Sequence, residues 1–139
     1  LEQVISDGSA LEKLAEFVEA QGGDRNCVYH PELLPVASVR KEVPAPASGY
    51  VSRIVCDEVG ICSLILGGGR ETKESGIDLA VGLVLCKKTG DPVRAGEPLA
   101  VIHANDSAKA QEAEKRFLSA CTISDKAPEK LPFIRAVIA

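Results

Sequence analysis

The hydrophobic periodicity of this chain changes once, near residue 36, and this change limits the possible folds more than any other feature. Before it, apolar residues recur at the spacing of one helix face, at Leu11, Leu14, Ala15 and Val18. Ser9 and Glu12 have the form of a capping box, and Gly22-Gly23 provides a stop signal. The pattern predicts an amphipathic helix over residues 10–21, followed by a loop that reaches Pro35.

After residue 36 the chain consists of short runs rich in β-branched residues, each ended by Pro, Gly or Asp. Such runs predict strands, here over residues 36–43, 50–55, 61–66, 79–87, 99–103 and 133–138. A second helix is expected to begin near Asn105-Asp106-Ser107, any of which can cap it. This order is typical of an α+β domain with a mostly antiparallel sheet. We expect two parts, a helical segment over residues 1–35 and a domain over residues 36–139.

The balance of charges argues against a nucleic-acid partner. The 139 residues include 16 Lys and Arg against 20 Asp and Glu, a net charge of −4, and no Trp. A nucleic-acid interface needs a basic face and often an aromatic stacking platform. No apolar run approaches the roughly 20 residues of a membrane helix, so no membrane partner is expected. The chain has no signal segment at its N-terminus and begins at Leu1, so we expect an unsecreted fragment of a longer protein.

The five cysteines predict neither a disulfide framework nor a metal site, because they are odd in number and form no CxxC pair. Four of them lie within apolar stretches, where a free thiol acts as a small hydrophobic residue. We therefore expect reduced, buried cysteines, no bound metal, and a cytoplasmic protein.

Two segments of the second part, residues 45–51 and 88–102, have similar turn chemistry. The first contains Ala-Pro-x-x-Gly-x-Val and the second Gly-Asp-x-Val-x-x-Gly-x-x-Leu. These motifs resemble the hammerhead half of biotinyl and lipoyl carrier domains, in which glycines form the corners of a flattened barrel. We therefore expect an α/β-hammerhead or barrel-sandwich-like domain. A carrier would present a lysine beside Met or Asp, and Lys73 has neither neighbour, so a scaffold without a swinging arm is favoured.

Few residues offer catalytic chemistry. Residues 67–70 combine three glycines with Arg70, and their N–H groups could converge on an anion, although a Gly-rich β-turn is the simpler interpretation. His30 and His103 do not adjoin a nucleophile in any known arrangement, so a catalytic triad has little support. The acidic residues in turn sequences are interpreted as turn and surface groups: Asp57, Glu58, Asp91 and Glu97.

A series of motifs runs in order along the chain from about Ile5. It comprises residues 8–13, 20–24, 33–35, 45–51, 60–61, 66–70, 73–74, 77–78, 81–82, 87–91, 93, 96–97, 102–103 and 124–128. This order resembles the pyrimidine-nucleoside phosphorylases and the related thymidine phosphorylases. The first three motifs are similar to the last helix and exit of that family's catalytic domain, and the others to its C-terminal domain.

The resemblance implies a parent pentosyltransferase. In this family inorganic phosphate, the co-substrate, attacks the anomeric carbon of a uridine- or thymidine-type nucleoside and releases the base and a (deoxy)ribose 1-phosphate. The catalytic and substrate-binding residues would lie upstream, so none is assigned here, no cofactor is expected, and the chain alone should be inactive. The resemblance also implies a homodimeric parent in nucleotide salvage. Two alternatives stay open, a biotinyl- or lipoyl-like carrier and a purely structural hammerhead module.

A last hypothesis concerns the glycine run. Enzymes often exclude water by closing a loop over the site, and three glycines between two apolar strands are costly to hold rigid. We hypothesise that residues 67–74 form a mobile flap at the rim of the catalytic cleft. In it Gly67, Gly68 and Gly69 supply freedom of movement and Arg70 a cationic arm.

Overall fold

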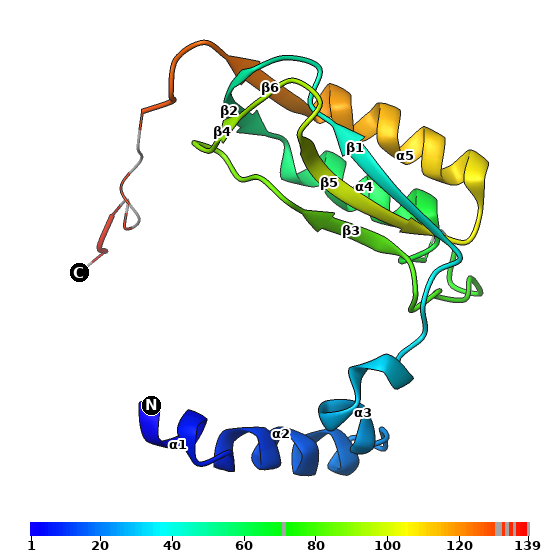
Figure 1. Cartoon of the computed structure of the whole chain (residues 1–139). Coiled ribbons are helices and arrows are strands. Elements are labelled where there is room, and N and C mark those ends of the chain that lie inside the picture. Colours follow the sequence, from blue (N-terminus) through cyan, green and yellow to red (C-terminus); the bar gives the residue numbers. More distant parts are fainter. Residues whose placement is uncertain (71, 130–131, 133, 135, 139) are drawn as a thin grey trace. The chain divides into compact units, whose positions relative to one another are not determined.

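The computed structural model describes residues 1–70, 72–129, 132, 134 and 136–138. The chain divides into two compact units, unit 1 (Leu1–Pro35) and unit 2 (Val36–Ala139). Unit 1 is helical, whereas unit 2 combines helices with sheets (Figure 1).

Unit 1 consists of α1 (Glu2–Ser6), α2 (Ser9–Ala20), α3 (Asn26–Tyr29) and a 3-10 helix (Pro31–Leu33). The expected helix is present as α2, but the expected capping box is wrong. Gly8, with a φ of 77°, is the N-cap, and the Asp7 carboxylate accepts the Ser9 N–H at 2.9 Å. Among residues 1–35, all of them described, Ala15 alone is buried. Three neighbouring apolar side chains are 45%, 49% and 62% exposed, namely Leu11, Leu14 and Phe17.

The described residues of unit 2 form two three-stranded antiparallel sheets, with strand orders β1-β5-β3 and β4-β2-β6. The first comprises β1 (Val39–Pro44), β5 (Pro98–Ala104) and β3 (Gly82–Leu85); the second comprises β4 (Pro92–Val93), β2 (Gly49–Ile54) and β6 (Cys121–Ser124). The expectation of an α+β fold with antiparallel strands is therefore confirmed. Ile102 pairs with both Lys41 and Leu83, which places β5 at the centre of the first sheet.

The strand expected over residues 61–66 is wrong, because these residues form the second half of helix α4 (Cys56–Leu66). Asp57 and Glu58 lie in its first turn, where negative charge favours a helix N-terminus. The expected strand over residues 133–138 lies partly outside the described residues, at positions 133 and 135. The described positions 134 and 136–138 carry no strand.

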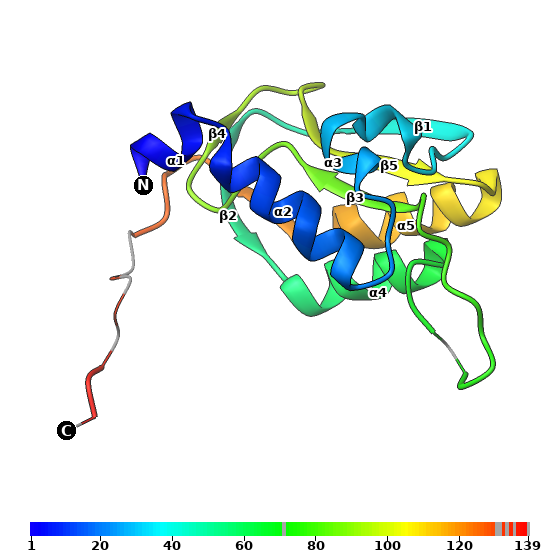
Figure 2. The same cartoon turned by 90° about the horizontal axis from the view of Figure 1, so that it is seen from below.

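The core of unit 2 is formed by residues of helices α4 and α5 and of both sheets. The second expected helix is present as α5 (Ser107–Ala120), and α4 and α5 lie side by side on one face of sheet β1-β5-β3 (Figures 1 and 2). The buried residues of α5 are three alanines and one large side chain, Ala110, Ala113, Ala120 and Phe117. Small side chains let the helix approach its neighbours closely, and Phe117 belongs to the same buried core cluster as Val43 and Ile102.

Candidate functional site

The glycine run does not connect two strands, because it ends helix α4. Gly67 has a φ of 103°, which glycine adopts at low cost. Its N–H donates to the Leu64 carbonyl at 3.0 Å, and the Gly68 N–H donates to the Ser63 carbonyl at 2.9 Å. This bond pattern is the Schellman motif of helix ends. A β-turn is therefore the wrong interpretation, and these two N–H groups are committed to the helix rather than free for an anion.

Gly68 and Gly69 also pack closely against the last turns of α4. A Cβ atom at Gly68 would lie 2.7 Å from the Ser63 hydroxyl and 3.2 Å from its carbonyl oxygen. A Cβ at Gly69 would lie 3.0 Å from Cδ1 of Leu64. Arg70, the next residue, is exposed. The close approach of backbone to helix therefore requires glycine at position 68, while the cationic side chain at position 70 faces solvent.

A chain of hydrogen bonds holds the end of this loop. The Asp78 N–H donates to the Gly67 carbonyl at 2.9 Å, which brings the two ends of the loop together. The Asp78 carboxylate accepts the Ala80 N–H at 3.0 Å and the Asn105 side-chain amide at 2.8 Å. The Asn105 carbonyl oxygen in turn accepts the Ser38 N–H at 2.8 Å. We call the Asp78–Asn105 hydrogen bond, with its two flanking backbone bonds from Ala80 and Ser38, the tether.

The tether also favours the charged form of the Asp78 carboxyl group. The donated hydrogen bond from Asn105, followed by that from Ala80, lowers the pKa of the Asp78 carboxyl below its usual value of 3.8. Hydrogen bonds to a carboxylate favour its charged form. Asp78 is therefore an anion at neutral pH and an acceptor, and it is unsuited to act as a general acid.

An open hollow of about 440 Å³ lies beside the tether. Its lining residues are Leu66, Gly67, Gly76, Ile77, Asp78, Asn105, Asp106 and Lys109. A smaller hollow of about 140 Å³ shares Gly67, Gly76 and Lys109 with it. The Asp106 carboxylate caps α5, accepting N–H groups from Ala108 and Lys109 at 2.7 and 3.1 Å. Asp78 and Asp106 thus serve the backbone, and the hollow offers one cationic side chain and an amide rather than an acid/base pair.

The other residues singled out by the sequence serve local structure. The Asp91 carboxylate accepts the Lys88 N–H at 2.8 Å, and Glu97 accepts the Arg94 N–H at 2.9 Å and pairs with Lys87 at 2.7 Å. Their interpretation as turn and surface groups agrees with these contacts.

The two histidines lie in different units, and Lys73 lies in the loop after α4. His30 contacts Glu32 at 3.1 Å in unit 1, whereas His103 lines a hollow of about 260 Å³ beside β3 in unit 2. Lys73 lies in the turn that Thr72 and Ser75 close after α4. A carrier lysine would instead sit at the tip of a β-hairpin, so the carrier alternative is not favoured.

The expectation of mostly buried cysteines is wrong, since only Cys62 among the five is buried, and Cys56 and Cys86 are exposed. Burial raises the pKa of the Cys62 thiol, and it raises the pKa of the half-buried Cys121 to about 11. Within the described ranges, no group of three His, Cys, Asp or Glu residues could hold a metal ion. No helix formed by the described residues is long and apolar enough to cross a bilayer.

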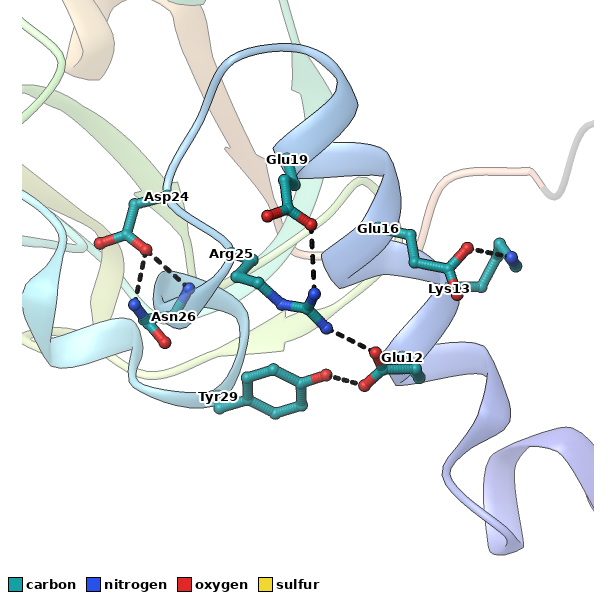
Figure 3. A network of polar contacts seen from close by, with 8 residues as sticks. All are labelled: Glu12, Lys13, Glu16, Glu19, Asp24, Arg25, Asn26 and Tyr29. Carbon is teal, nitrogen blue, oxygen red and sulfur yellow. Dashed lines mark hydrogen bonds and ion pairs between the residues drawn. The ribbon is translucent and has the colours of Figure 1, made fainter.

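Unit 1 carries a polar network of its own (Figure 3). Arg25, just before α3, binds Glu12 and, at 3.1 Å, Glu19, both on α2. The Tyr29 hydroxyl donates to Glu12, which lowers the pKa of that carboxyl and raises the pKa of the tyrosine. The acidic face of α2 is thus paired in part rather than simply solvated. The network fastens α3 to α2 and contains no nucleophile.

Sequence reasoning missed the tether. Asn105 was recognised as a possible helix cap and Asp78 as part of a motif, but their contact joins residues 27 positions apart. The available signal was the Ile77-Asp78 motif, which places a carboxylate between the glycine run and the next strand.

The fold and the site define an α+β module whose glycine loop is anchored by side-chain hydrogen bonds and which brings no catalytic pair together among its described residues. The family model that matches this chain is described as the pyrimidine nucleoside phosphorylase C-terminal domain, and it covers residues 50–124. That range extends from β2 to β6. The chain belongs to this family, so the resemblance stated from the motifs is confirmed.

Curated relatives agree with the family match. The chain is 51% identical over 105 residues to a pyrimidine-nucleoside phosphorylase of Bacillus subtilis (strain 168), covering 76% of this chain and 24% of the relative. The corresponding protein of Staphylococcus haemolyticus is 52% identical over 105 residues, with the same coverage. That of Staphylococcus aureus (strain USA300) is 46% identical over 123 residues, covering 88% of this chain and 28% of the relative. The matched part thus spans about a quarter of the length of these relatives.

Proposed function

We propose that this chain is the C-terminal part of a pyrimidine-nucleoside phosphorylase, a pentosyltransferase. In the proposed reaction, an oxygen of inorganic phosphate forms a bond to the anomeric carbon of a uridine- or thymidine-type nucleoside. The bond from that carbon to the pyrimidine nitrogen breaks, and the base leaves with the bonding electrons and takes up a proton. The observation that carries this proposal is the family match over residues 50–124, together with relatives 46–52% identical that bear this name.

The residues that perform the chemistry are proposed to lie upstream of Leu1. Unit 1 is then the last helical segment of the catalytic domain, and unit 2 is the C-terminal domain attached to it. The exposed apolar side chains of α2, such as Phe17 at 62%, support this division, because a helix that ends a larger domain would pack them there.

We further propose that unit 2 has the hammerhead, or barrel-sandwich-like, arrangement expected from its two motif segments. Backbone hydrogen bonds between these segments support it. Ala45 and residues 96–97 are joined by two of them, each of 2.9 Å, and Val51 is joined to Gly90 and Asp91 by two of 2.8 and 2.9 Å. Such pairing of two Gly-containing corners is what a flattened barrel needs.

The flap hypothesis is kept as a proposal in a narrower form. Because Gly67 and Gly68 are hydrogen-bonded to α4, the moving part would begin at Gly69 and present Arg70 at the cleft rim. Arg70→Ala in the intact enzyme is expected to lower kcat/KM roughly tenfold without unfolding the protein. Lys73→Ala, a nearby exposed cation, is the matched control, and equal kinetics in the two variants would reject the flap.

For the parent enzyme we propose a homodimer in the cytoplasm, with a pyrimidine nucleoside and phosphate as substrates and without nucleic-acid or membrane partners. The exposed thiols of Cys56 and Cys86 suit a reducing compartment. The homodimer follows from the family resemblance, and light scattering of the intact enzyme tests it.

The activity is tested by comparing two proteins. The intact polypeptide that carries this chain should release uracil or thymine from the nucleoside only when phosphate is present. The 139-residue chain alone should show no turnover, because the proposed sites for phosphate and base lie outside it. Phosphate-dependent turnover by the isolated chain would refute the upstream placement of the site, and an inactive intact polypeptide would refute the function.

A further inference from the structure

Asn105 lies where three separate segments of unit 2 meet. Its side-chain carbonyl oxygen accepts from the backbone of Ser38, at the beginning of the unit. Its side-chain amide donates to Asp78, at the end of the loop that starts with Gly67. Asn105 follows Ala104, the last residue of β5, and precedes Asp106, the N-cap of α5. One side chain therefore joins the entry to the unit, the glycine loop and the first turn of its longest helix.

The chemistry of the contact is specific to an amide at position 105. The Ser38 N–H needs an acceptor and the Asp78 carboxylate needs a donor, and asparagine supplies one of each on a short stem. Aspartate would keep the acceptor for Ser38 but would place a second negative charge 2.8 Å from Asp78. Alanine would leave both partners without the bond. Position 105 therefore favours asparagine over aspartate, although the two side chains have the same size, because only asparagine can donate to Asp78.

The tether controls the whole glycine loop because the loop is closed at its base. Gly67 and Asp78 are joined backbone to backbone at 2.9 Å, so the two ends of the loop meet beside the tether. Gly67 is fixed by α4 and Asp78 by Asn105. Without Asn105, Asp78 keeps its bonds to Gly67 and Ala80 but loses its link to Asn105 and, through it, to Ser38. The end of the loop is then no longer fixed to the first residues of unit 2.

We propose that Asn105 is a positioning residue for phosphorolysis: through Asp78 it fixes the glycine loop against the first residues of unit 2. The inference rests on the proposed function, including the proposed flap with Arg70, and on residue contacts within unit 2. Asn105 touches no reacting atom, and its effect is to hold the loop in one orientation, so that domain closure presents Arg70 in the same place in each cycle.

A charge-swap experiment in the intact enzyme tests this role. Asn105→Asp creates two facing carboxylates. It is expected to lower kcat roughly tenfold with little change in the KM for nucleoside, because the proposed flap closes only after the substrate has bound. Combining it with Asp78→Asn restores one donor and one acceptor with their places exchanged. The double variant is expected to recover kcat to within about twofold of the wild type, a rescue that loss of folding alone would not give.

Asp91→Asn is the matched control. It makes the same chemical change at another carboxylate of unit 2 that accepts a backbone N–H in a turn, and unchanged kinetics are expected. Hydrogen exchange of the Asp78 amide gives a second readout: it should be faster in Asn105→Asp and slow again in the double variant. If Asn105→Asp does not fold, Asn105→Ala removes both the donor and the acceptor without adding charge and should lower kcat at least roughly threefold.

The outcomes separate the two proposals. A wild-type polypeptide without phosphorolysis overturns the proposed function. Wild-type turnover together with unchanged kcat in Asn105→Asp, or a double variant as slow as the single one, overturns the positioning role of Asn105 and leaves the proposed function intact.

Discussion

Unit 1 leaves its apolar side chains in water, whereas unit 2 encloses them. Leu11, Leu14 and Phe17 on α2 are 45–62% exposed, while Leu99, Ile102 and Phe117 in unit 2 are at most 2% exposed. Burying one large apolar side chain is worth about 2 kcal/mol, so unit 1 forgoes most of the stabilisation that unit 2 gains. The comparison shows that an amphipathic sequence can form a helix, as in α2, without having its apolar face covered by other residues of the same unit.

In unit 1, helices α2 and α3 are joined by polar side-chain contacts. Arg25 joins two carboxylates of α2, and Tyr29 donates to one of them (Figure 3). All of these side chains are in contact with solvent, where ion pairs contribute little and are screened by salt. Unit 1 should therefore be the less stable of the two units. The following measurements test the contrast between them.

The largest effect is expected from Phe117→Ala. Removing a large, 1% exposed side chain from the interface of α5 with the first sheet leaves a cavity. Such substitutions cost about 3–5 kcal/mol, so the urea midpoint of unit 2 should fall steeply. The measurement is urea unfolding of the 139-residue chain, followed by circular dichroism.

Phe17→Ala is the matched control in unit 1. The same truncation at a 62% exposed position should change the free energy of unfolding by no more than about 0.5 kcal/mol. Equal losses in the two variants would contradict the contrast between the units. A much larger loss for Phe17→Ala in the intact enzyme than in the chain would indicate that upstream residues cover this face.

An intermediate effect is expected in amide hydrogen exchange. Protection requires that a hydrogen bond open rarely, and units with few buried contacts open often. Amides of α2 should exchange at least roughly tenfold faster than those of β5 and α5. Uniform protection across residues 1–104, independent of protein concentration, would argue against the boundary at Pro35.

The smallest effect is expected at acidic pH. Hydrogen bonds from the backbone of Lys109 and Ala108 lower the pKa of Asp106 below 3.8 in the folded state. Its stabilising contribution is therefore complete above 3.8 and is lost as the pH falls through the lowered folded-state pKa. Asp106→Asn keeps a capping oxygen without titrating, so its stability should depend less on pH between about 5 and 3. A parallel pH profile in the variant and the wild type would refute this contribution of the cap.

Much of unit 2 could be predicted from the sequence, because turn chemistry is local. The strands near Tyr50 and Leu99 and the helix that follows Asp106 were placed correctly from Gly, Pro and cap signals. The second half of helix α4 is predicted as a strand because residues 61–66 form a continuous apolar run, a pattern that a buried helix and a buried strand share. The acidic pair Asp57-Glu58 before the run and the glycines after it were the signals for a helix.

The candidate site was less predictable for the same reason. If residues 61–66 are assigned to a strand, the glycine run is predicted to be a turn between two strands. Its N–H groups are then predicted to lack a hydrogen-bond partner. In the structure they bind α4, and the loop ends at Asp78, whose partner Asn105 is distant in sequence. A contact of this kind depends on where α4 ends relative to β5, and no local pattern encodes that distance.

The natural cysteines can report how often helices α4 and α5 separate. A thiol reagent at mildly alkaline pH should modify the exposed Cys56 and Cys86 at once. Cys62 is fully enclosed, and its thiol donates to the Ala113 carbonyl at 3.4 Å, so it can react only when α4 separates from α5. Its labelling rate in mass spectra then counts those separations directly, without any introduced probe.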